Sequence, residues 1–377
     1  MSTQTWLLEV SRPTAGFLGG ADKAAQWRTP PLKALLRQWW RVAVAKDCGY
    51  DAEKLREQEL ALFGAASDDK KKKLGKSKVR LRLEEWRNGG MRSLSDDLRV
   101  FHPEVGEDGR TIGSQLYLGY GPIGYQKGQG TVLNVAHAIA PGESNTLWVS
   151  YEDEKGIREA IRLACWFGTM GSRSRNGWGS VVMTGEGLET VDVLLDGGDS
   201  LLSGFCRPLE ECLRLDWPHA FGMDENGVLV WKSRQVFDSW EKTMKHLAEV
   251  KIAFRTAVSI KNNHDLKKPS FEERHVLAYP VTNHGVDGWV EKRHGRYKTD
   301  KRERLVQSER LANQIRFKVV KSKGQYCALV YHLPCDIPSD LKCKLGRAAP
   351  SLEDQIGVWR KVHRVLDAKM TRLGGLV

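Results

Sequence analysis

The chain has 377 residues, of which 41% are hydrophobic, and it carries a formal net charge of +12. This length suggests about two domains with buried cores. No apolar run approaches the roughly 20 residues that span a bilayer, and the seven cysteines lack the spacing of a zinc framework. We therefore expect a soluble cytoplasmic protein with reduced thiols and exclude an integral membrane protein.

The positive charge is concentrated toward the C-terminus. Residues 251–377 carry 26 lysines and arginines against 13 acids, whereas residues 151–250 carry 11 against 17 and residues 1–150 carry 22 against 17. A strongly basic surface attracts polyanions because their counterions are released on binding. This asymmetry favours a nucleic-acid partner over charge that serves solubility alone.

The first half alternates strands and helices. Helices are expected over residues 32–46, after two prolines, and over 154–167, where apolar residues recur at helical spacing. Strands are expected over residues 5–10, 79–83, 115–118, 131–138 and 181–183, with a polar loop over 67–77. The order strand, helix, strands, helix, strand is the split βαβ, or ferredoxin-like, pattern.

The second half has a weaker pattern after an acidic linker over residues 185–200. Helices are expected over 201–213, 235–254 and 352–372, and strands over 274–280, 314–321 and 325–333. We divide the chain into an N-terminal α+β domain, residues 1–190, and a C-terminal domain, residues 191–377. The two halves could be one duplicated module.

The first expected helix carries a basic stripe. Lys33, Arg37 and Arg41 follow one another at four-residue spacing, with no acid between them on that face. Trp40 lies beside them in sequence and could pack a base or anchor the helix. The stripe could be an ordinary solvated face, but three cations in line can also hold consecutive phosphates.

A glycine-rich loop, FGTMGSRSRNGWGSV, follows the second expected helix over residues 167–181. Its glycines allow positive φ and close approach to the backbone, Arg173 and Arg175 offer forked donors for phosphate, and Trp178 offers a stacking face. A tight turn with locally paired arginines is the alternative. The glycines that we expect to admit RNA are Gly168, Gly171, Gly177 and Gly179.

Two segments resemble nucleotide sites only superficially. Residues 119–124 (GYGPIG) fit the spacing of a dinucleotide fingerprint, but further glycines follow where a helix is required. Residues 75–77 (GKS) resemble the end of a phosphate-binding P-loop, but Lys70 stands where the first glycine is needed. We therefore expect no cofactor.

Catalytic groups are hard to identify. His284, and His294 within the basic segment 292–304, could serve a metal-independent ribonuclease, although a basic segment that contacts RNA or is disordered is the simpler interpretation. Asp96 and Asp97 could bind a metal or form a surface turn. No nucleophile and base can be paired by spacing, so we expect no catalytic residue and no metal site.

The two motifs together resemble the RAMP superfamily of CRISPR-associated proteins. The segment RTPPLKALLRQWWR followed distantly by GSRSRNGWGS is similar to the first subunit of the Cmr (type III-B) RNA-silencing complex. Residues 62–64 (LFG) and 310–317 (RLANQIRF) also fit that order. Ala34, Thr169 and Asn176 depart from the family pattern at positions where glycines or a basic residue are usual.

The resemblance implies two ferredoxin-like (RRM-like, βαββαβ) domains in a non-catalytic, RNA-binding subunit. Such a subunit contacts the 3′ region of the guide RNA or the target RNA and lies beside other RAMP subunits in antiviral defence. A RAMP endoribonuclease that processes precursor RNA, or a protein–protein adaptor, stays open as an alternative.

Overall fold

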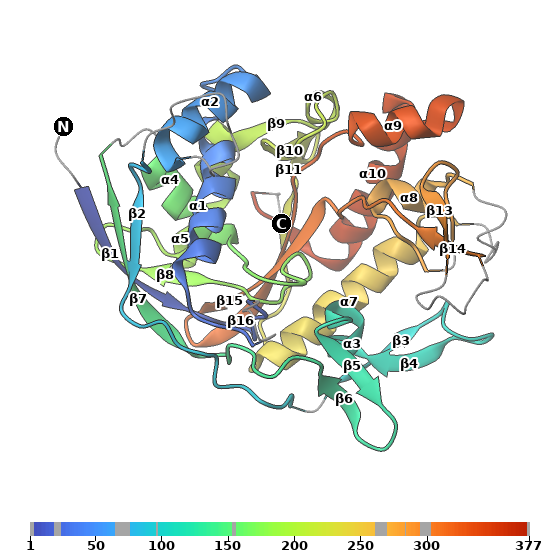
Figure 1. Ribbon diagram of the computed structural model, residues 1–377, viewed down its shortest axis with the longest axis horizontal. Coiled ribbons are helices and arrows are strands. Elements are labelled where there is room, and N and C mark those ends of the chain that lie inside the picture. Colours follow the sequence, from blue (N-terminus) through green and yellow to red (C-terminus); the bar gives the residue numbers. More distant parts are fainter. Residues whose placement is uncertain are drawn as a thin grey trace.

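The computed structural model describes residues 4–18, 24–64, 76–95, 97–152, 156–260, 270–282, 284–294 and 303–374. Within these residues the chain forms two four-stranded antiparallel sheets, and helices pack against each of them (Figure 1). The α+β fold class predicted from the sequence is therefore confirmed. The domain boundary after residue 190 stays a prediction.

The first sheet has the strand order β2-β7-β1-β8. Its strands are β1 (Gln4–Ser11), β2 (Arg80–Leu83), β7 (Ser144–Tyr151) and β8 (Val182–Thr184). Helix α1 (Thr29–Val44) lies between β1 and β2 in the chain, and α4 (Ile157–Phe167) connects β7 to β8. Strand β7, which pairs with β1 over all eight residues, was not predicted, although the overall order of elements was.

The second sheet repeats this arrangement in the order β15-β16-β12-β17. Its strands are β12 (Val230–Lys232), β15 (Ile315–Ser322), β16 (Gln325–His332) and β17 (Thr371–Arg372). Helix α7 (Trp240–Thr256) precedes β15 and α10 (Leu352–Lys369) precedes β17. Both sheets thus have the strand order and helix positions of a βαββαβ unit.

The remaining elements lie between and beside these units. They are α2 (Ala52–Phe63), β3 (Arg99–His102), β4 (Arg110–Gly113), α3 (Ser114–Gly119), β5 (Ile123–Gln126), β6 (Gly130–Leu133), α5 (Val191–Gly197), η1 (Gly198–Phe205), β9 (Cys206–Pro208), α6 (Leu209–Cys212), β10 (Phe221–Asp224), β11 (Gly227–Val228), α8 (Glu273–Leu277), β13 (Val290–His294), β14 (Glu303–Gln307), α9 (Ser339–Leu345) and η2 (Gly346–Ala348). Helix α3 packs on α7 (Figure 1).

Three predicted elements are wrong. Residues 115–118 form helix α3 rather than a strand, because the carboxylate of Asp97 accepts the backbone N–H groups of Gln115 and Leu116 in its first turn. Residues 274–280 contain α8 and no long strand, and Glu272 and His275 form a reciprocal cap there. Residues 201–213 divide into η1, β9 and α6 instead of one helix.

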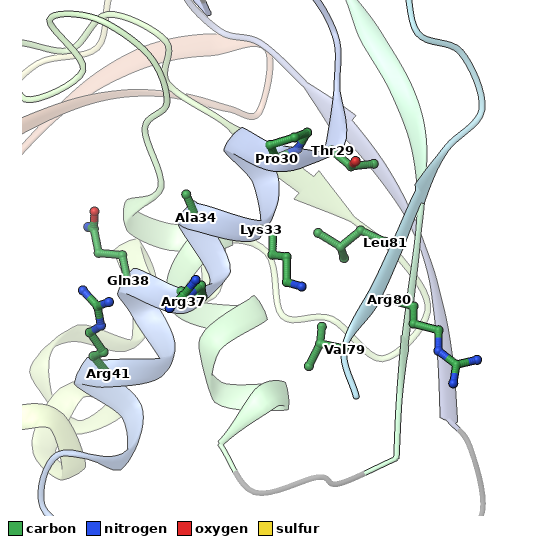
Figure 2. A pocket seen from close by; sticks show the side chains of 10 residues that line it. All are labelled: Thr29, Pro30, Lys33, Ala34, Arg37, Gln38, Arg41, Val79, Arg80 and Leu81. Atoms are coloured by element: carbon green, nitrogen blue, oxygen red, sulfur yellow. The ribbon is translucent and has the colours of Figure 1, made fainter. Parts of the chain in front are cut away.

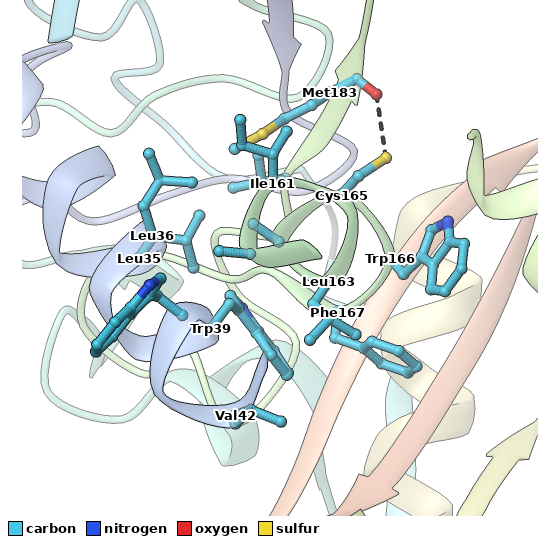
Figure 3. Packing of buried hydrophobic residues seen from close by; sticks show 14 of the residues in the cluster. Leu35, Leu36, Trp39, Val42, Ile161, Leu163, Cys165, Trp166, Phe167 and Met183 are labelled. Carbon is cyan, nitrogen blue, oxygen red and sulfur yellow. Dashed lines mark hydrogen bonds between the residues drawn. The ribbon is translucent and has the colours of Figure 1, made fainter. Parts of the chain in front are cut away.

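The core joins the two units. Leu35 and Trp39 of α1 lie against the face of α4 that carries Leu163 and Phe167 (Figure 3). The ring of Trp39 also lies within 6.0 Å, centroid to centroid, of Tyr331 in β16. The apolar stripe of α1 therefore packs against both βαββαβ units, which fixes the position of its basic face.

Candidate nucleic-acid interface

The basic stripe of α1 lines a cavity of about 820 Å³ between this helix and strand β2 (Figure 2). Lys33 points from α1 toward Val79 and Leu81, and its Nζ donates to Ser77 Oγ at 2.8 Å. Burial lowers the pKa of Lys33, and the positive charge of Arg37 lowers it further. The stripe is therefore present at the surface, as predicted.

One carboxylate partly neutralises this stripe. Glu59 of α2 has only 5% of its side chain exposed and accepts hydrogen bonds from Arg37 at 2.6 Å and from Arg41 at 2.5 Å. Burial alone would raise the pKa of Glu59, but the hydrogen bonds and charges of Arg41 and Arg37 outweigh it and lower the pKa. Two of the three predicted phosphate ligands thus share an internal counter-ion.

The two tryptophans predicted beside the cations are buried. Trp40 is 2% exposed and its ring meets the edge of Phe63, and Trp178 is 0% exposed between Phe17 and Trp240. Neither ring has a free face for a base, so a stacking role is excluded. Both tryptophans brace the protein, which is the other role that we considered for them.

The glycines of the loop make room for the protein's own backbone. A Cβ at Gly168 would lie 2.1 Å from the carbonyl oxygen of Ala164, and one at Gly171 would lie 2.6 Å from that of Phe17. Gly179, at φ +65°, would place a Cβ 1.9 Å from the carbonyl oxygen of Met170. The hypothesis that RNA requires these glycines is therefore wrong, because the groups that lie against them are carbonyl groups of the protein's own backbone.

The backbone N–H groups of the loop are also largely engaged. Those of Ser172 and Gly179 donate to carbonyls of the segment after β1, and those of Asn176 and Gly177 donate within the loop. A Cβ at Gly177, φ +89°, would lie 3.1 Å from Leu247 of α7. An anion site made of free backbone N–H groups is therefore not what this loop provides.

The second unit holds the loop and neutralises the end of α4. The N–H of Phe317 in β15 donates to the carbonyl of Arg175 at 3.0 Å. Lys318, fully buried, donates to the carbonyl of Cys165 in the last turn of α4, and Tyr331 Oη donates to that of Phe167 at 2.8 Å. The negative end of the α4 dipole, which would repel an anion at the loop, is thus capped by donors from β15 and β16.

Arg173 and Arg175 line a second, larger cleft of about 1490 Å³. Both side chains are exposed, and Arg173 adopts φ +58°, in the left-handed region. The cleft is bordered by the loop, α3, α7 and the segment before β15. Its basic lining residues are Arg173, Arg175, Lys251, Arg255, Arg274 and Arg310, against two acidic ones, Glu104 and Glu107.

Four of these cations lie close enough together to repel one another. Arg310 repels Arg173, and both Arg255 and Arg173 repel Lys251. Shielding from bulk water, followed by this repulsion, lowers the pKa of Arg173 and lowers that of Lys251 to about 7. Among the described residues no carboxylate forms an ion pair with Arg173, Lys251, Arg255 or Arg310. Glu104 pairs with Arg274, and although burial raises the pKa of Glu104, this pairing and the charge of Arg255 lower it.

Lys251 connects α7 to the glycine loop. Its Nζ donates to Asn176 Oδ1 at 2.9 Å and lies 5.3 Å from the ring centroid of Tyr117. Only 8% of the residue is exposed. Arg175, at the same loop, has its pKa lowered to about 10, first by shielding within the cleft and second by the neighbouring Arg316.

The basic stripe of α1 and the arginines of the glycine-rich loop, which we expected to bind RNA, do not form one common site. The stripe of Lys33, Arg37 and Arg41 and the arginines of the loop line two cavities that share no lining residue. The α1 stripe faces β2, whereas the loop faces α3 and α7. The physical reason is that α1 buries its other face on α4, so its cations point away from the loop that follows α4.

The sequence interpretation missed Lys251, Arg255 and Arg310. Lys251 and Arg255 stand four residues apart on α7 and could have been recognised as a basic stripe of the kind noted on α1. Arg310 begins the segment RLANQIRF. No local signal indicated that these cations would face the loop, because their proximity depends on how α7 packs against α3.

The other groups that the sequence suggested for catalysis or metal binding serve the fold, are buried, or lie outside the described residues. Asp97 accepts hydrogen bonds from α3 and Thr131, and Asp96 lies outside the described residues. His284 is 6% exposed, and the side chain of His294 lies outside the described part, as do residues 295–302 of the basic segment. In the described residues no group of three or more His, Cys, Asp or Glu could hold a metal, and no helix has the length and apolar character to cross a bilayer.

Comparisons with known proteins give structural neighbours only. No family model and no curated protein matches the sequence. The chain is similar to Cmr1 from Pyrococcus furiosus in its apo form, with 16% identity, 97% of each chain covered and a TM-score of 0.46. It is also similar to a chain of the type III-B Cmr-beta complex bound to cognate target RNA, with 12% identity, 96% and 99% coverage and a TM-score of 0.44.

Proposed function

We propose that this protein binds RNA through the cleft beside the glycine loop, as a non-catalytic subunit of a type III CRISPR effector. One observation carries the binding role: Arg310, Arg173, Lys251 and Arg255 line one cleft and, among the described residues, none of them forms an ion pair with a carboxylate. Holding like charges together is unfavourable unless an anion joins them. A polyanion with regularly spaced phosphates meets that requirement.

The size of the cleft agrees with an extended ligand. Its volume of about 1490 Å³ exceeds the roughly 300–1,000 Å³ of small-molecule sites. The two motifs that resemble the RAMP superfamily support the assignment to an effector complex, because one of them supplies Arg173 and Arg175. In such a complex the protein would contact the guide RNA 3′ region or the target RNA and lie beside other RAMP subunits.

Binding of a labelled single-stranded RNA to the full chain tests the role directly. With Arg175 as a fifth contact, the logarithm of the association constant should fall with the logarithm of salt concentration with a slope approaching about −3.5, since each phosphate neutralised on a single strand contributes about 0.7. Binding that is absent at low salt, or that does not depend on salt, would contradict the proposal.

Two further measurements separate the alternatives. Site-specific cleavage of repeat RNA in EDTA, lost on a single His→Ala change, would identify an endoribonuclease. Assembly with other RAMP subunits in the absence of any RNA contact would identify an adaptor. Purification of the native complex with guide RNA attached, and no cleavage by the isolated chain, is the expected result.

A further inference from the structure

The cleft contains an aromatic ring that none of the contacts above uses. Tyr120, the residue that follows α3, is 69% exposed and lines the cleft. A single exposed ring is ordinary on a protein surface, but Tyr120 exposes its ring inside a cleft lined by cations. Unlike Trp40 and Trp178, this ring has an open face.

Tyr120 lies next to the cations that line the cleft. A Cβ placed on the following residue, Gly121, would lie 3.4 Å from Nη2 of Arg173, so the Arg173 guanidinium rests against this turn. Gly121 has φ +114°, and its carbonyl accepts a hydrogen bond from the Asn134 side chain at 2.9 Å. The turn that presents Tyr120 is therefore held in place beside a phosphate-binding group.

A buried hydroxyl with no partner among the described residues lies on α3, one helical turn before Tyr120. The hydroxyl of Tyr117 is buried and has no hydrogen-bond partner in the described part of the chain. Tyr117 lines the same cleft, and burial raises the pKa of its hydroxyl against the opposing charge of Arg255, so the hydroxyl stays a donor at neutral pH. An orphaned donor beside cations points to a polar ligand with acceptor atoms.

From this arrangement we propose that Tyr120 is the base-stacking platform of the cleft and that the cleft takes RNA whose bases are unpaired. This inference rests on the proposed RNA-binding function and defines its ligand. The loop and α7 supply cations for the sugar–phosphate backbone, and α3 supplies the ring. In a duplex the faces of the bases are covered by their neighbours, so only a splayed single strand can stack on a side chain.

The test compares Tyr120→Ala with wild type on a mixed-sequence 20-nucleotide single-stranded RNA, the same RNA annealed to its complement, and an abasic version. Removal of one stacking ring should weaken single-strand binding about 5- to 150-fold. The salt slope should not change, because no charge is lost. Tyr120→Phe should bind like wild type, and Tyr120→Ala should lose nothing further on the abasic strand.

Tyr125→Ala is the matched control. Tyr125 is 64% exposed on β5 but does not line the cleft, so this change should leave binding intact. If wild type binds single strands with the expected salt slope while Tyr120→Ala binds equally well, the stacking inference is overturned and the proposed function stands. Equal affinity of wild type for duplex and single strand would also overturn it. If wild type binds no RNA, the proposed function itself fails.

Discussion

Replacement of Arg173 and Arg175 by alanine should weaken RNA binding and make it less dependent on salt concentration. Both side chains are exposed in the cleft, and neither has a carboxylate partner among the described residues. If each holds one phosphate of a single strand, the salt slope should become less negative by about 1.4, at about 0.7 per phosphate. Between 50 and 200 mM salt, this difference amounts to roughly sevenfold in affinity.

Fluorescence anisotropy of a labelled single-stranded RNA, repeated at five or six salt concentrations, measures this slope. The matched control removes two surface lysines, Lys242 and Lys323, which pair with Asp238 and Asp196 and do not line the cleft. It subtracts the same charge from the protein and should change the slope little. Thermal unfolding of both double variants checks that they are folded.

If the variant is folded and its salt slope equals that of wild type, Arg173 and Arg175 do not hold phosphates. An equal loss in the control would show that net charge rather than the cleft determines binding.

Three further results are expected. RNA affinity should fall by up to about tenfold per pH unit above pH 7. The pKa of Lys251 is lowered to about 7 in the free protein, so this side chain must take up a proton before it can bind a phosphate. The variant Lys251→Arg, measured by the same anisotropy series, should show no such pH dependence. Gly179→Ala should lower the free energy of unfolding in urea by more than about 1 kcal/mol, because its Cβ would meet the carbonyl of Met170 at φ +65°. Glu59→Gln should destabilise the protein by about 1–3 kcal/mol at pH 7, since it weakens the charged hydrogen bonds from Arg37 and Arg41. Because those bonds lower the pKa of Glu59 in the folded protein, the difference from wild type should shrink only once the pH falls below the ordinary pKa of a glutamate.

Long periodic elements could be predicted from the sequence. Helices α1, α4, α7 and α10 and strands β1, β15 and β16 were found, because each buries a regular apolar stripe or alternates strongly. Strands β12 and β17 have three and two residues, too few for any periodic pattern. Helix α3 was mistaken for a strand because its start is capped by Asp97, a residue outside the segment itself.

The site was predicted in part. Arg173 and Arg175 do line a cleft, but the glycines around them were assigned to RNA when they accommodate Phe17 and Met170. Glycines in a sequence indicate that some group lies close to the backbone there. They do not indicate whether that group belongs to a ligand or to the protein itself. Likewise, a lone basic stripe gives no information on Glu59, eighteen residues beyond Arg41, which neutralises it.

The most direct test of RNA binding in the cleft is to crosslink a 4-thiouridine-substituted single-stranded RNA to the full chain and to identify the crosslinked peptides by mass spectrometry. We expect crosslinks to residues around Tyr120, around Arg173 and around Lys251, which lie on three sides of the cleft. Crosslinks confined to the α1 cavity, around Lys33 and Val79, with none in the cleft, would contradict this proposal.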